Sequence, residues 1–268
     1  MSGNFLDSVP IWAVYLGLLL LFLAAVEGGG YVLGDRRQKS TDYVDESRTA
    51  QAGIVLGALL TLAALLLAFT FSMAGSQFDS RRQLVIDDVN AIGTAFLRAQ
   101  SLPMPQRVAS RELLSQYVAE RATLFDESLA QRLARAEQMQ QQLWAAVTEV
   151  AHQEPTPVVS LYMQALNELI DLHTKMVSVE VWVRIPDLII ATLALLSFAT
   201  MVLTGYLLGL RERRYGFPTV LMVFTYATVF GMVIDLDRPA RGLFQVNQAP
   251  MVQLSESIQA ELANTPSE

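Results

Sequence analysis

The chain has 268 residues, of which 52% are hydrophobic, and its mean hydropathy is +0.34. This composition is too apolar for an ordinary soluble domain. The net charge is −7 and the sequence has no basic stripe, so nothing indicates a nucleic-acid partner. The sequence has no cysteine, which excludes disulfides and metal sites built from thiolates.

Four apolar segments are long enough to cross a lipid bilayer, which needs about 20 apolar residues per helix. No Lys or Arg precedes the first, and it is too long for the apolar part of a signal peptide, so we expect a retained helix. The segments lie near Pro10–Leu33, Ala50–Ala74, Asp187–Leu210 and Phe217–Ile234. The sequence therefore predicts an all-α membrane protein with four transmembrane helices in a 2+2 arrangement and a helical-bundle insert between the second and third.

The insert shows apolar residues at helical spacing in three stretches. These stretches are Gln106–Phe125, Asp126–Gln153 and Val158–Val183. Prolines within 102–105 and 154–157 separate them, and Thr156 or Ser160 can cap the third helix. The predicted organisation is a first transmembrane pair (residues 1–74), an extramembrane helical insert (75–187), a second transmembrane pair (188–236) and a polar C-terminal tail (237–268).

The second apolar segment runs into Arg81–Arg98 without a proline or a turn residue. We therefore expect one continuous helix that leaves the bilayer and carries polar groups into water. Asp87, Asn90, Thr94 and Arg98 are three or four residues apart, so they share one face of this helix. Apolar and small residues between them indicate that the helix is packed on two sides.

The distribution of Lys and Arg in the short loops predicts the orientation in the membrane. The loop Asp35–Thr49 has four basic residues and the loop Arg211–Tyr215 has three, and both lie on one side of the membrane. The N-terminal leader has none, and residues 237–268 have two. The positive-inside rule thus places the insert and both termini outside the cytoplasm, in a bacterial inner membrane.

Charged and polar residues gather where the second, third and fourth segments end on the side of the insert. Two interpretations remain open for them. They form either an ion vestibule, which concentrates or excludes ions, or a set of salt bridges and hydrogen bonds that fastens the insert to the membrane helices. The candidate residues are Arg81, Arg82, Asp87, Asn90, Arg98, Asp235, Asp237 and Arg238.

Asp235 closes the apolar run of the fourth segment, where a lone carboxylate in lipid costs on the order of several kcal/mol. It therefore needs a partner, and Arg81 and Arg82 are the candidates. A third interpretation combines Asp235 with three other acids in an oxygen-rich site for a hard cation such as calcium, although their spacing does not match an EF-hand. These acids are Asp87, Asp88 and Asp237.

Enzymatic function has little support in the sequence. There is no phosphate loop, nucleophile elbow or zinc-binding helix motif. His152 and His173 are isolated from any metal-ligand or triad pattern, so we interpret both as solvated or internally satisfied. We expect no catalytic activity, no cofactor and no resident metal.

Two groups of motifs surround the insert. The first group is Arg81-Arg82, Asp88-Val-Asn-Ala-Ile-Gly-Thr-Ala-Phe-Leu-Arg98, Leu102-Pro103 and Arg111-x-Leu-Leu-x-x-Tyr117. The second group is Ile185-Pro186 and Leu236-Asp-Arg-Pro-x-x-Gly242. In their order, and in the layout of the membrane segments, these motifs resemble the bestrophin-like domain family, a family of largely unknown function.

The resemblance implies a distant relationship to bestrophins, which are pentameric anion channels with a cytoplasmic soluble part. Two features differ: the second segment lacks their aromatic-rich pore neck, and the basic loops place the insert on the opposite side. The leading hypothesis is a homo-oligomeric ion channel in the lipid bilayer, since four helices alone are too few to enclose a pore. The alternative is a non-conducting membrane sensor or scaffold whose insert binds a partner or ligand.

Overall fold

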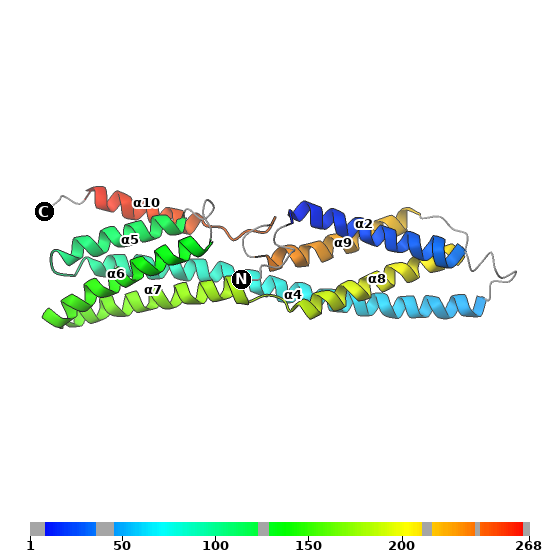
Figure 1. The fold of residues 1–268 in the computed structure, drawn as a ribbon, viewed down its shortest axis with the longest axis horizontal. Helices are drawn as coiled ribbons and strands as arrows, with labels where there is room; N and C mark the ends of the chain where they lie inside the picture. The colour runs from blue at the N-terminus through cyan, green and yellow to red at the C-terminus, as the bar shows by residue number, and fades with distance from the viewer. Residues whose placement is uncertain (1–8, 36–45, 123–128, 211–215, 239–241, 265–268) are drawn as a thin grey trace. The chain divides into compact units, whose positions relative to one another are not determined.

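The computed structural model describes residues 9–35, 46–122, 129–210, 216–238 and 242–264 (Figure 1). Within these ranges every regular element is helical and there is no strand. The elements are α2 (Ile11–Glu27), the π-helix η1 (Gly28–Asp35), α4 (Glu46–Ala99), α5 (Gln106–Ala122), α6 (Leu129–Gln153), α7 (Pro157–Trp182), α8 (Asp187–Leu210), α9 (Phe217–Asp237) and α10 (Ala249–Asn264). Most basic residues of the two orientation loops, at 36–45 and 211–215, lie outside the described ranges.

The chain divides into two compact units. The first unit comprises residues 1–78 and 184–245, and the second comprises residues 79–183 and 246–268. The expected continuity of the second apolar segment with the charged run is confirmed, because α4 is a single helix of 54 residues. Its residues up to Phe78 belong to the first unit, and those from Asp79 onward belong to the second.

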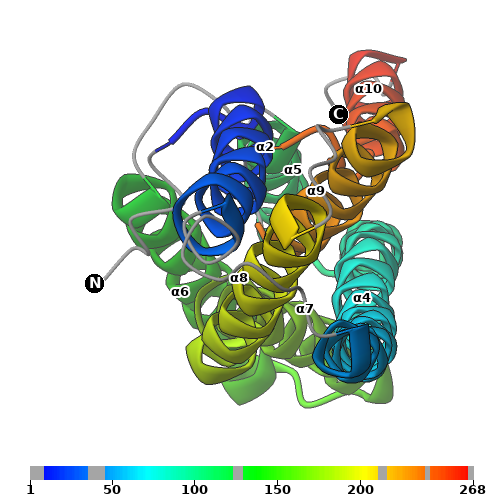
Figure 2. The same ribbon diagram turned by 90° about the vertical axis from the view of Figure 1, so that its right-hand side faces the viewer.

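The first unit has an apolar core formed by α2, α8, α9 and the N-terminal part of α4 (Figure 2). Phe22 of α2 is fully buried and packs edge-to-face on Phe230 of α9, with the ring centroids 6.1 Å apart. The following π-helix lies directly against the backbone of α8. A Cβ atom at Gly29 would be 2.1 Å from the carbonyl oxygen of Val202, so only glycine permits this approach.

Among the described residues, three helices are long and apolar enough to cross a membrane. They lie within Thr49–Ala99, Asp187–Leu210 and Phe217–Asp237, in agreement with the second, third and fourth expected segments. The first expected segment, Pro10–Leu33, corresponds to α2 and η1. Because α2 has only 17 residues before the helix changes to π geometry, this segment is a shorter apolar helix, and the 2+2 arrangement remains a prediction.

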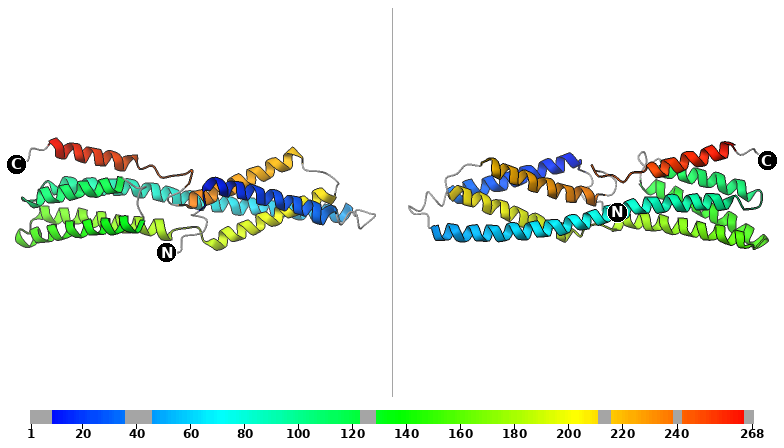
Figure 3. Two further views of the ribbon diagram at one scale, coloured as in Figure 1. Left: turned by 45° about the horizontal axis from the view of Figure 1, so that its top comes forward. Right: turned by 180° about the vertical axis from the view of Figure 1, so that it is seen from behind.

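The second unit is a helical bundle of α5, α6, α7, α10 and the C-terminal part of α4 (Figure 3). The three helices expected in the insert are present, with breaks at the expected prolines. Thr156 caps α7, since its hydroxyl accepts a hydrogen bond from the N–H of Val159 at 3.3 Å. The structure adds α10, a helix that the sequence analysis does not predict within residues 237–268.

Candidate functional site

The C-terminal end of α9 carries three of the candidate residues, and each bonds to the backbone of a different segment of the first unit. The fully buried carboxylate of Asp235 accepts a hydrogen bond from the N–H of Leu243, at 3.1 Å from both oxygens. The carboxylate of Asp237 accepts a hydrogen bond at 2.8 Å from the N–H of Ile185, just before α8. Arg238 donates a hydrogen bond at 2.9 Å to the carbonyl of Val9, just before α2.

This arrangement has a structural consequence. Three side chains within one turn of α9 hold the segment that enters α2, the segment that enters α8 and the segment that follows α9. A backbone N–H is a partner that lets an ionised carboxylate persist in a buried place. All three contacts lie within the first unit, so they join segments of that unit to one another. Whether these residues fasten the insert to the membrane helices or line an ion path remains a prediction.

The other five candidates lie along α4 in the second unit. Arg81 is buried, Arg82 and Asn90 are exposed, and Asp87 and Arg98 are partly exposed. The amide of Gln83 donates to Asp87 at 2.9 Å, and Arg98 donates to the carbonyl of Leu161 in α7 at 2.6 Å. Since the eight candidates belong to two units, their assembly into one vestibule remains a prediction, and so does the pairing of Asp235 with Arg81 or Arg82.

The cation-site interpretation has no support in the described part of the chain. Among those residues, no three His, Cys, Asp or Glu side chains are grouped so that they could hold a metal ion.

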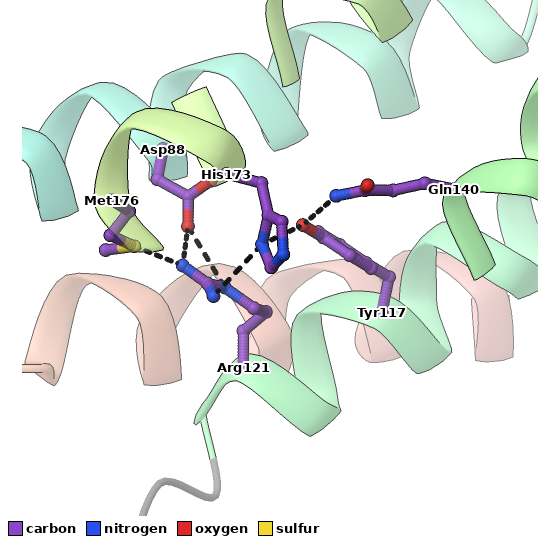
Figure 4. A network of polar contacts seen from close by, with 6 residues as sticks. All are labelled: Asp88, Tyr117, Arg121, Gln140, His173 and Met176. Carbon is purple, nitrogen blue, oxygen red and sulfur yellow. Dashed lines mark hydrogen bonds and ion pairs between the residues drawn. The ribbon is translucent and has the colours of Figure 1, made fainter. Parts of the chain in front are cut away.

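A buried polar network lies inside the bundle of the second unit (Figure 4). Asp88 of α4, which is only 1% exposed, forms a salt bridge with Arg121 of α5. Both Nε and Nη2 of Arg121 donate to the same oxygen of Asp88, at 3.2 and 2.7 Å. The same guanidinium also contacts the sulfur of Met176 in α7. One ion pair therefore ties together three helices of the bundle.

His173 of α7 connects this network to Tyr117 and Gln140 (Figure 4). Its Nδ1 lies 3.5 Å from the hydroxyl of Tyr117 and 3.5 Å from Nη1 of Arg121. The amide of Gln140 in α6 donates to the Tyr117 hydroxyl at 3.1 Å. His173 is only 3% exposed. Four helices thus contribute polar side chains to one enclosed region.

The enclosure changes the acid–base behaviour of the network. Burial, together with the positive charge of Arg121, lowers the pKa of His173 to about 4, so the imidazole is neutral at pH 7. Burial raises the pKa of Tyr117 to about 12, with a smaller contribution in the same direction from Asp88. Burial likewise raises the pKa of Tyr162, another enclosed tyrosine of this unit, to about 12.

A second polar contact fastens α10 to the bundle. Arg111 of α5 is 5% exposed and donates to the carboxylate of Glu261 in α10. Its guanidinium also stacks over the ring of Phe96 in α4, 4.5 Å from the ring centroid.

These two polar centres are not visible in the sequence pattern. From the sequence, Asp88 stands in a family motif and is a possible cation ligand, and His173 is interpreted as a solvated or internally satisfied side chain. His152, the other histidine, is exposed at the end of α6, whereas His173 is enclosed. Arg111 and Tyr117 stood in a motif, but their spacing does not reveal partners that come from other helices.

The family to which the chain belongs is shown by comparison with protein families. A family profile of the bestrophin-like domain matches residues 20–251, which is most of the chain. The chain belongs to the bestrophin-like family. The resemblance inferred from the motifs is thereby confirmed, and this bestrophin-like chain is a membrane protein. A comparison with curated proteins gives no match.

Solved structures show the same fold at low sequence identity. The crystal structure of a bacterial bestrophin homologue from Klebsiella pneumoniae aligns with a TM-score of 0.64 and 13% identity, covering 96% of this bestrophin-like chain and 100% of that chain. A crystal structure of a membrane protein variant aligns with a TM-score of 0.67 and 12% identity, with the same coverage. A single-site variant of the Klebsiella homologue gives 0.61 and 14%, covering 95% and 98%.

Proposed function

We propose that this bestrophin-like chain is the subunit of an oligomeric ion channel. The observation that supports the proposal most directly is the division of the apolar part of α4 into three faces. In the most apolar 18-residue stretch of α4, only 17% of the residues are buried within one subunit. Most of this surface must therefore meet lipid or another copy of the chain.

The three faces differ in residue size and in exposure. Each consists of residues three or four apart, as one side of an α-helix requires. The face that packs inside the subunit is Ala63, Leu67, Thr70 and Ala74, all buried. An exposed face of mostly large apolar residues is Ala58, Leu62, Leu65, Phe69 and Met73. An exposed face of small and weakly polar residues is Gly53, Gly57, Thr61, Ala64 and Ala68.

The chemistry of the two exposed faces supports different roles for them. Large apolar side chains suit contact with lipid tails, whereas small residues let other helices come close or line a narrow aqueous path. A Cβ atom at Gly53 or Gly57 would meet nothing within 4 Å, so this surface is open in the single subunit. In a ring of subunits, the small face lines the axis and the large face contacts lipid.

The proposal includes the topology that such a ring needs. The four segments span the inner membrane as two pairs, with α2 and η1 together forming the first span. The proposal keeps the division of the chain at residues 1–74, 75–187, 188–236 and 237–268. It also places the insert and both termini outside the cytoplasm. The lipid bilayer, identical subunits and an inorganic ion are the partners that it requires.

Single cysteines test the proposal cleanly, because the chain has none of its own. Ala64→Cys and Ala68→Cys place a thiol on the small face, and Ala58→Cys is a matched control on the large apolar face. Each variant is reconstituted in liposomes, and ion flux is measured for several salts before and after a charged, membrane-impermeant methanethiosulfonate is added. We expect the reagent to change flux at Ala64 and Ala68 and to leave the Ala58 variant unchanged.

Failure has two distinct forms. Equal effects on both faces would contradict the assignment of the small face to the ion path. Absence of flux in every salt, with a monomer or dimer in detergent, would reject the channel and favour the alternative of a non-conducting sensor or scaffold.

A further inference from the structure

His173 is a titratable group in the interior of the second unit that the channel proposal does not use. The groups that face it come from three other helices: Asp88, reached through Arg121, from α4, Tyr117 and Arg121 from α5, and the uncharged Gln140 from α6. Along α7 itself, Met176 contacts the same guanidinium. The described surroundings of the ring therefore contain one cation, one anion and neutral groups.

The hydrogen-bonding capacity of these neighbours decides the protonation state of the ring. Arg121 can only donate, so the ring nitrogen that it faces must be an acceptor. The hydroxyl of Tyr117 accepts a hydrogen bond from the amide of Gln140, and it can donate its own proton to Nδ1 of His173. Nδ1 of His173 thus faces two donors at 3.5 Å, an arrangement that favours a neutral imidazole with its proton on Nε2, a buried atom with no hydrogen-bond partner among the described residues.

A second proton on His173 would reverse these contacts. Nδ1–H would point at a guanidinium and at a hydroxyl that already accepts from Gln140, and two positive charges would stand 3.5 Å apart in a buried place. The one nearby anion is Asp88, one of whose oxygens already accepts both hydrogen bonds from Arg121. The other oxygen of Asp88, Oδ1, is buried and has no hydrogen-bond partner among the described residues, so the repulsion from Arg121 and the burial of the ring are what oppose a charged imidazole.

We propose that His173 is an acid-responsive latch: when neutral it holds α7 against α4, α5 and α6, and when protonated it releases this packing. The low pKa of the buried ring agrees with the geometry and places the transition in acidic solution, between pH 6 and pH 4. The latch belongs to the second unit alone, so it goes beyond the channel proposal and does not need a pore. In the proposed topology the latch would face the outside of the cell.

The test measures amide hydrogen exchange of the full chain in detergent micelles by mass spectrometry. The exchange rates are corrected for the intrinsic pH dependence of exchange in unprotected peptides. The chain has only two histidines, so His152→Asn is a matched control for His173→Asn. Asn at position 173 keeps an oxygen acceptor near the place of Nδ1 but cannot take up a proton. In the wild type and in His152→Asn, we expect protection of α7 and α5 to fall on the order of tenfold between pH 6 and pH 4. In His173→Asn we expect little change.

Two results would overturn the proposal. One is an equal fall in His173→Asn, which would assign the acid response to Asp88 or to other carboxylates. The other is unchanged protection of the wild type at pH 4. If His173→Asn does not fold, the ring carbon resonances of the two wild-type histidines decide: titration of His173 above pH 6 rejects the latch, and titration near pH 4 supports it.

Discussion

Gly242 lies so close to Asp235 that a Cβ atom at Gly242 would be 2.0 Å from Oδ1 of the carboxylate. The N–H of the next residue, Leu243, donates to both oxygens of the same carboxylate. The motif that ends in Gly242 thus has a physical meaning: glycine allows the chain to fold back against a buried acid and to satisfy it with a backbone donor.

This relationship predicts that Gly242→Ala destabilises the protein. The added methyl group must displace the carboxylate or the loop, which weakens the hydrogen bonds of a fully buried acid and costs about 1–3 kcal/mol. Thermal unfolding in detergent micelles measures the loss. Gly75→Ala in α4 is the control, because a Cβ atom there would meet nothing within 4 Å. Equal stability of the two variants would contradict this explanation of the motif.

The Asp88–Arg121 pair makes a second prediction. Asp88→Asn or Arg121→Gln leaves the partner charge buried and uncompensated, so either change should cost about 3–5 kcal/mol. The double variant should recover part of this loss, because no lone charge then remains. The free energy of unfolding of the four proteins forms a double-mutant cycle.

The control for this cycle is the pair Glu120 and Arg135, whose side chains are 23% and 41% exposed and 3.1 Å apart. Water reaches this partly exposed pair and screens it, so the corresponding cycle should give about 0–1 kcal/mol. A coupling energy at Asp88 and Arg121 no larger than this would show that the enclosed pair does not hold the bundle together.

The sequence is a good guide to the helices because their signals are local. Prolines at 103, 105, 155 and 157 interrupt the helical pattern, and the unbroken run after the second apolar segment predicts the continuity of α4. The same kind of signal could have revealed α10. Met251, Ser255 and Ile258 recur at helical spacing and are buried, but the polar residues between them made the segment resemble a tail.

The polar centres could not be predicted in this way, because their partners are distant in the chain. Asp88 and Arg121 are on different helices, and His173 is on a third. No local spacing distinguishes Asp88, which points into the bundle, from its neighbour Asp87, which is partly exposed. At the first apolar segment, the sequence does not show the change to π geometry that brings Gly29 and Gly34 against the backbone of α8.

Alkaline pH should destabilise the second unit through its buried tyrosines. The pKa of Tyr162 is raised by burial to about 12 in the folded protein, against 10.0 in an exposed tyrosine. The stabilising effect is complete below pH 10 and is lost as the pH rises from 10 to 12, because the unfolded chain gives up its phenolic proton first. The loss should reach about 2–3 kcal/mol. Unfolding of the wild type and of Tyr162→Phe across this range measures it, and an identical pH dependence of the two proteins would refute the prediction.

The contact between Arg111 and Glu261 predicts how α10 is held. Glu261→Ala leaves the guanidinium of Arg111 buried without this carboxylate, while its stacking on Phe96 remains. Glu261 itself is 42% exposed, so the expected cost is moderate, about 1–2 kcal/mol, which corresponds to a rise in local opening of about 5- to 30-fold. Hydrogen exchange of peptides from α10 measures the opening directly.

Two further variants make this prediction specific to the pair. Glu256→Ala changes an exposed acid on the same helix and should alter the exchange of α10 by less than about 0.5 kcal/mol. Replacing both partners, as in Arg111→Leu with Glu261→Ala, removes the buried cation together with its counter-charge. This double variant should restore part of the protection of α10, because apolar contact with Phe96 and the bundle core can then substitute for the ion pair. If Glu261→Ala and Glu256→Ala affect α10 equally, the helix is held by its apolar face alone and Arg111 serves only the packing of Phe96.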